Sequence, residues 1–122
     1  MAFSNDVVIA DSVPANQTYS LISMNAGKSI RSNPARPVSE PVILTISHEA
    51  LKKASKTHYR HLVRLDMTEL DTDNVTKFNG YVYVVIGQDD RVVTEAMIQD
   101  LTVQLKNFLT SGNVTKLLRN EP

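Results

Sequence analysis

Residues 42–47, with the sequence VILTIS, carry the pattern that decides the fold. Positions 42, 44 and 46 are large and apolar, whereas positions 45 and 47 carry the hydroxyl side chains of Thr45 and Ser47. Successive side chains of a β-strand point to opposite faces of its sheet. The alternation therefore predicts a half-buried strand with one polar face.

Residues 58–65, HYRHLVRL, repeat this two-residue period, with His58, Arg60 and Arg64 on one side of the predicted strand. Burying two unpaired guanidinium groups would be too costly, so both arginines should face outward. A hairpin would place the hydroxyl groups of Thr45 and Ser47 beside them. Hydroxyl and guanidinium groups bind phosphates and base edges, so this face suits RNA as well as it suits a solvated surface.

The remaining segments up to residue 86 also favour an antiparallel sheet. We predict an N-terminal hairpin within residues 1–24 and the other strands within 28–86. Residues 33–41 contain three prolines, which lack the ladder N–H, so they form a loop or an edge. Residues 81–86, YVYVVI, form a strand that is apolar on both sides, and its facing cannot be read.

Two charged segments inside this region are predicted to be loops. Residues 49–56, EALKKASK, have helix-forming side chains but are short and uncapped, so we expect a basic loop with at most one helical turn. Residues 66–77 are acidic and rich in threonine, which is typical of a loop.

The period changes to that of a helix after Asp90, which we expect to be the N-cap. Gly112 suits the position after a helix end, and Asn113 can cap a second short helix, which gives two helices within residues 91–119. The apolar stripe of the first helix comprises Val93, Met97, Leu101, Leu105 and Phe108, widened by Ile98 and Leu109. The second helix carries Leu117 and Leu118. The order of strands then helices predicts an α+β fold.

Composition predicts one ordinary globular domain spanning residues 1–122. The chain has 42% hydrophobic residues and no cysteine, so a disulfide framework and thiolate chemistry are excluded. No targeting segment or membrane-spanning run is visible, and we expect a product that is cytosolic or remains where it was made.

The net charge is zero, from 13 basic and 13 acidic residues, but the charges are unevenly spread along the chain. Residues 28–64 contain eight basic and two acidic residues, and residues 65–104 contain two basic and eight acidic residues. We therefore expect a positive and a negative part of the fold, which are either solvated patches or binding surfaces.

Side chains for catalysis are few. His48, His58 and His61 are the only histidines, and no third ligand stands at metal-binding spacing. No glycine-rich phosphate loop occurs. We predict that the protein is not an enzyme and has no metal, cofactor, membrane or small-molecule partner.

The ordered features resemble the coat proteins of single-stranded RNA bacteriophages of the levivirus type along essentially the whole chain. The matching features are the N-terminal hairpin, PVILTIS with a basic loop, THYRHLVRLD, an acidic loop, a hydrophobic strand, and two helices broken at LTSGN. The resemblance implies an antiparallel sheet with two C-terminal helices in an interlocked homodimer, in which each chain's helices cross the partner's sheet. It also implies an icosahedral shell, assembled in the bacterial host cytoplasm, whose inner sheet face binds single-stranded viral RNA and represses replicase translation through an RNA hairpin.

Carried onto this sequence, the resemblance assigns RNA binding to one set of residues and dimerisation to another. The RNA-binding set is Thr45, Ser47, His58, Arg60 and Arg64, and the dimer set is Met97, Leu101, Leu105, Phe108, Leu117 and Leu118. The alternatives are a small cellular RNA-binding or adaptor domain and, more distantly, an α+β enzyme.

Overall fold

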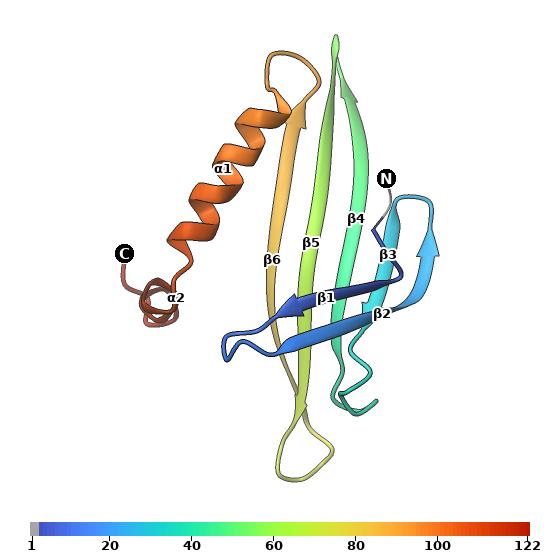
Figure 1. Ribbon diagram of the computed structural model, residues 1–122, viewed down its shortest axis with the longest axis vertical. Coiled ribbons are helices and arrows are strands. Elements are labelled where there is room, and N and C mark those ends of the chain that lie inside the picture. The colour runs from blue at the N-terminus through green and yellow to red at the C-terminus, as the bar shows by residue number, and fades with distance from the viewer. Residues whose placement is uncertain (1–2) are drawn as a thin grey trace.

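The computed structural model describes residues 3–122 and contains one six-stranded antiparallel sheet followed by two helices (Figure 1). The strands lie in sequence order and are β1 (Asp6–Ala10), β2 (Asn16–Asn25), β3 (Lys28–Ser32), β4 (Val42–Lys53), β5 (Lys56–Leu70) and β6 (Lys77–Asp89). The helices are α1 (Glu95–Phe108) and α2 (Ser111–Leu118). The predicted α+β class, N-terminal hairpin and pair of C-terminal helices are confirmed, although positions 1 and 2 of the hairpin segment lie outside the described residues.

The predicted basic loop at residues 49–56 is wrong, because β4 and β5 pair without interruption up to a two-residue turn. The ladder runs to the pair Lys53 and Lys56, and Ala54 takes a left-handed φ of 52° in the turn. Pairing with β5 overrides the helix preference of this segment. Every second residue of the β4 end forms backbone hydrogen bonds to β5, whereas a short uncapped helix would leave most of its terminal N–H and C=O groups unpaired.

The predicted acidic loop is shorter than expected, because β5 continues to Leu70 and β6 begins at Lys77. Asp73 holds the loop in shape by accepting hydrogen bonds from the Val75 N–H, the Thr76 N–H and the Thr76 hydroxyl. These bonds, the Thr76 hydroxyl first, lower the pKa of Asp73 because they stabilise its charged form. The loop of residues 33–41 lies where the prolines predict it.

The β1–β2 hairpin folds across the three long strands and makes the core of the subunit. The β2–β3 register shifts between Leu21 and Ser23, an irregularity of the kind that bends a sheet, and Figure 1 shows β1 and β2 crossing β4, β5 and β6. Tyr19 packs there against the apolar side chains of β4, and burial, followed by the charge of Asp11, raises its pKa. The buried hydrophobic cluster is Tyr19, Val42, Leu44 and Ile46.

Both helices begin at threonine caps, which corrects the predicted boundaries. The Thr94 hydroxyl accepts a hydrogen bond from the Met97 N–H at 3.3 Å, so α1 starts after Thr94 and not after Asp90. The Thr110 hydroxyl caps α2 in the same way, which places Gly112 and Asn113 inside the second helix rather than at its boundary. A hydroxyl one turn before the apolar stripe satisfies a free helix N–H, which explains these starts.

Candidate nucleic-acid interface

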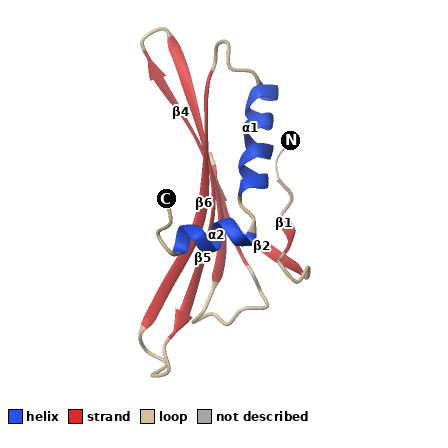
Figure 2. Ribbon diagram, turned by 90° about the vertical axis from the view of Figure 1, so that its left-hand side faces the viewer, coloured by secondary structure: helices blue, strands red, loops and turns tan. Residues whose placement is uncertain are grey.

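The three long strands have one covered face and one open face. Figure 2 shows α1 and the β1–β2 hairpin on the same side of these strands. Leu44 and Ile46 belong to that side, because they form the buried cluster with Tyr19 of the hairpin. We call the opposite side the open face. Within residues 3–122 no helix or strand packs on it.

The β4–β5 register confirms the predicted facing of four of the site residues. Thr45 lies directly opposite Arg64, and Glu49 lies opposite Arg60. Opposed residues of an antiparallel pair share a face, so Thr45, Ser47, Arg60 and Arg64 all belong to the open face. Neither hydroxyl makes a hydrogen bond to another described protein group, which leaves both available to a ligand.

Each arginine of the open face is paired with a carboxylate, which the sequence did not indicate. The Arg60 guanidinium lies 3.0 Å from the Glu49 carboxylate, its cross-strand neighbour. The Arg64 Nε donates to both carboxylate oxygens of Asp66 at 2.8 and 2.9 Å. The open face is therefore a surface of paired charges, and phosphates would compete with these acids for the guanidinium groups.

The predicted separation into a positive and a negative part is wrong for the same reason. Ion pairs join residues 28–64 to residues 65–104 because β5 runs through both segments and β6 lies beside it. These pairs are Arg36 with Glu69, Lys56 and His58 with Asp89, and Arg64 with Asp66.

Two tyrosines of β6 extend the open face and were missed by sequence reasoning. Tyr81 and Tyr83 lie on the face of Arg64, whose opposed residue on β6 is Tyr83. Their rings are stacked with centroids 5.9 Å apart, and the Arg64 guanidinium lies 4.3 Å from the Tyr81 ring centroid. Both rings are more than half exposed, at 59% and 52%. Because residues 81–86 are apolar on both faces, only the β5–β6 register could show where the rings point.

His58 lies on the open face but is held by Asp89. Its Nδ1 is 2.9 Å from a carboxylate oxygen of Asp89, and its ring occupies the space in which a Cβ at residue 87 would stand 3.0 Å from Nε2. A side chain at residue 87 would therefore require the imidazole to shift by a few tenths of an ångström. Hydrogen bonds from His58 and then Lys56 lower the pKa of Asp89.

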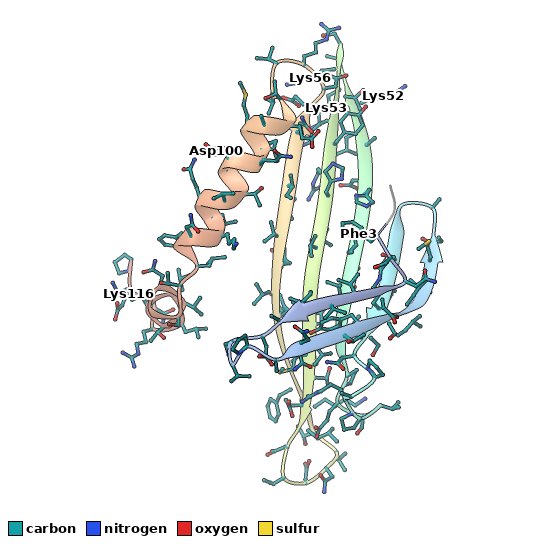
Figure 3. The ribbon with its side chains drawn as sticks, viewed as in Figure 1. Phe3, Lys52, Lys53, Lys56, Asp100 and Lys116 are labelled. Atoms are coloured by element: carbon teal, nitrogen blue, oxygen red, sulfur yellow. The ribbon has the colours of Figure 1, made fainter. Side chains whose placement is uncertain are left out.

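The β4–β5 hairpin ends in a basic tip beyond the rest of the sheet. Lys52, Lys53 and Lys56 are exposed and lie together at this end in Figure 3. The Lys56 ammonium lies 3.2 Å from Asp89.

The predicted dimer residues lie on helices that bury no side chain within the subunit. Leu101 and Leu105 line an open apolar groove between α1 and β6, together with Ile98, Val84 and Ile86. The six predicted residues are all exposed, from 44% for Leu105 to 80% for Leu118. The other edge of β6 carries no strand among the described residues.

Residues 3–122 contain no group of three or more potential metal ligands. In the same range, neither helix has the length and apolar character needed to cross a bilayer.

Three solved structures that superpose on this chain are a coat protein and two virus-like particles. The coat protein of bacteriophage EMS014 superposes with a TM-score of 0.69 at 18% identity, over 91% of this chain and 80% of that one. The virus-like particle of bacteriophage AVE019 gives 0.73 at 10% identity, over 99% of this chain and 98% of that one. The virus-like particle of Beihai levi-like virus 21 gives 0.69 at 12% identity, over 99% and 97%.

No protein-family model matches the sequence, and no curated protein matches it. The likeness is therefore one of fold, and it covers nearly the whole chain.

Proposed function

Because the chain has the fold of the levivirus-type coat proteins, we propose that it is a viral coat protein that forms homodimers, assembles into an icosahedral shell and binds single-stranded viral RNA on its open face. The observation that carries this proposal is the combination of that fold, over nearly the whole chain, with helices that have no fully buried side chain in their own subunit. The protein would then reside in the virion after assembly in the cytoplasm of a bacterial host.

The surfaces without a partner support the homodimer. A strand of 13 residues with a free edge invites pairing with another chain, and β6 has few charges that would discourage it. The apolar stripe of α1 lies beside this edge, so one second copy related by a two-fold axis would satisfy both surfaces at once. In such a dimer the β6 strands pair and each chain's helices cover the partner's sheet, through Met97, Leu101, Leu105, Phe108, Leu117 and Leu118.

The chemistry of the open face supports RNA as its ligand. Stacked, exposed tyrosines offer a platform for unpaired bases, and each stacked base contributes about 1–3 kcal/mol in single-stranded nucleic-acid complexes. Arg64 beside the rings adds a phosphate contact or a cation–π contact, and Arg60 adds a second cation. Thr45 and Ser47 supply free hydroxyls for base edges or for the ribose 2′-OH.

Electron microscopy of the purified protein tests the coat function. We expect uniform closed shells when the protein is expressed alone, and RNA that is recovered from them after nuclease treatment of the exterior. A small cellular RNA-binding or adaptor domain would instead remain a monomer or small oligomer at all concentrations, and that result would contradict the proposal.

Repression of replicase translation is tested separately. A reporter whose start codon lies within an RNA hairpin that the protein selects from a random library should be repressed by the native protein. If the Tyr83 ring stacks on a base of the hairpin, the Tyr83→Ala variant should fail to repress the same reporter.

A further inference from the structure

Arg31 of β3 is a buried cation without a counter-ion. Only 1% of its surface is exposed, which makes it one of the most deeply buried side chains among residues 3–122. It takes part in none of the ion pairs of the described chain. Buried charges in proteins are normally paired, because an unpaired charge loses its hydration without gaining a favourable interaction with an opposite charge.

The hydrogen bonds of Arg31 go to neutral groups and use only part of its donors. Nε donates to the Asn5 carbonyl at 3.2 Å, Nη2 donates to the Ser4 carbonyl at 2.8 Å, and Nη1 donates to the Ser29 hydroxyl at 2.6 Å. A guanidinium carries five N–H groups. One N–H on Nη1 and one on Nη2 therefore remain without an acceptor among the described residues.

Arg31 lines an open pocket whose walls contain no acid. The pocket lies between the N-terminal segment, the β2–β3 turn and β4, on the covered side of the sheet, and Phe3 marks it in Figure 3. Its walls are partly apolar and partly cationic. The lining residues are Phe3, Met24, Asn25, Gly27, Lys28, Ser29, Arg31, Ile46 and His48.

We propose that this pocket binds one carboxylate carried on a short aliphatic stem. The two free N–H groups, on different terminal nitrogens of one planar guanidinium, match the two oxygens of a carboxylate. Phe3, Met24 and Ile46 give an aliphatic stem an apolar wall, which a heavily hydrated anion would not use. The site is distinct from the open face, which lies on the other side of the sheet.

A carboxylate on a short aliphatic stem has two sources: a free small carboxylic acid, or a glutamate or aspartate side chain of a second copy of the chain. The second source rests on the proposed assembly.

Met24 provides the test, because it lines the pocket, is 55% exposed and lies directly across the ladder from Ser29. Met24→Glu installs a carboxylate on a stem of similar length, and Met24→Gln is its neutral match. Both variants change a surface side chain, so folding should survive. Melting temperatures are measured at neutral pH in sodium chloride and in sodium butyrate of equal ionic strength, and subunit association is measured by sedimentation.

If the occupant is free, native protein should melt about 5 °C higher in butyrate at roughly ten times its Kd, and Met24→Gln should gain less, because it lacks part of the apolar wall. Met24→Glu should already melt higher than Met24→Gln in chloride and should gain nothing from butyrate. If the occupant is an acid of a second copy, butyrate should not stabilise the native protein, and Met24→Glu should associate about tenfold more weakly than Met24→Gln. Equal melting and equal association of the two variants, without a butyrate effect, would overturn the proposal, whether or not the protein forms shells.

Discussion

The acids of the open face form ion pairs with its arginines and compete with RNA phosphates for them, so removing an acid should strengthen RNA binding. Glu49→Gln frees Arg60 from its partner at 3.0 Å, and Asp66→Asn frees Arg64 from its partner at 2.8 Å. We expect each variant to bind RNA more tightly than the native protein, because a guanidinium without a carboxylate partner is free for a phosphate.

The magnitude follows from exposure. The side chains of these pairs are between 36% and 53% exposed, which is the range of surface ion pairs that contribute about 0.2–1 kcal/mol. In the variant, an RNA phosphate does not have to displace the carboxylate from the arginine. The binding free energy should therefore improve by at most about 1 kcal/mol, which is up to about fivefold in affinity. One added phosphate contact should also steepen the slope of log affinity against log salt by about 0.7 for single-stranded RNA.

The assay is a fluorescence-anisotropy titration of labelled single-stranded RNA over a range of monovalent salt. Arg60→Ala and Arg64→Ala should shift affinity and slope in the opposite direction, because each removes a cation and leaves an unpaired acid on the open face. Asp100→Asn is the matched control, since it changes the net charge equally from helix α1 (Figure 3). Affinity and slope that stay at the native values in both acid variants and both alanine variants would refute phosphate binding by this face.

Four further outcomes are expected. Leu101→Asp should abolish the soluble dimer in light scattering, because the dimer would bury an unpaired charge, and a native protein that is monomeric at micromolar concentration would contradict this. Thr45→Ala should reduce discrimination between a preferred hairpin and random RNA in filter binding by about 1 kcal/mol, while nonspecific affinity stays unchanged. The lowered pKa of Asp73 means that its contribution to loop stability is present above the ordinary aspartate pKa of 3.8 and is lost as the pH falls below that value. Hydrogen exchange of the Val75 amide, relative to its intrinsic rate, should therefore accelerate in that window, and Asp73→Asn should remove the pH dependence. Val92 has a φ of 69°, which is costly for a β-branched residue, so Val92→Asn should raise the unfolding free energy by about 1 kcal/mol in urea titrations; a loss of stability would count against strain there.

The facing of the site residues on β4 and β5 could be predicted because strand parity is a local property. Alternation fixes which side chains of one strand share a face, and the cost of burying Arg60 and Arg64 selects the outward one. The placement of Tyr81 and Tyr83 could not be predicted, since a strand that is apolar on both sides carries no parity signal. The carboxylate partners of the arginines could not be predicted either, because the sequence of residues 49–56 predicts a loop and Glu49 lies in that segment.

The sequence by itself determined the class of the fold, the order of its elements and the polarity of its central strands, all of which depend on periodicity and on turn residues within short windows. Only the tertiary structure decided how charges combine and which groups remain unmatched. Arg64 and Tyr81 meet because β5 and β6 pair in one register, and Arg31 loses its water because the N-terminal segment folds over β3. Electrostatic interactions and desolvation depend on which residues are near in space. The order of charges along the chain therefore predicted neither the ion pairs of the open face nor the burial of Arg31.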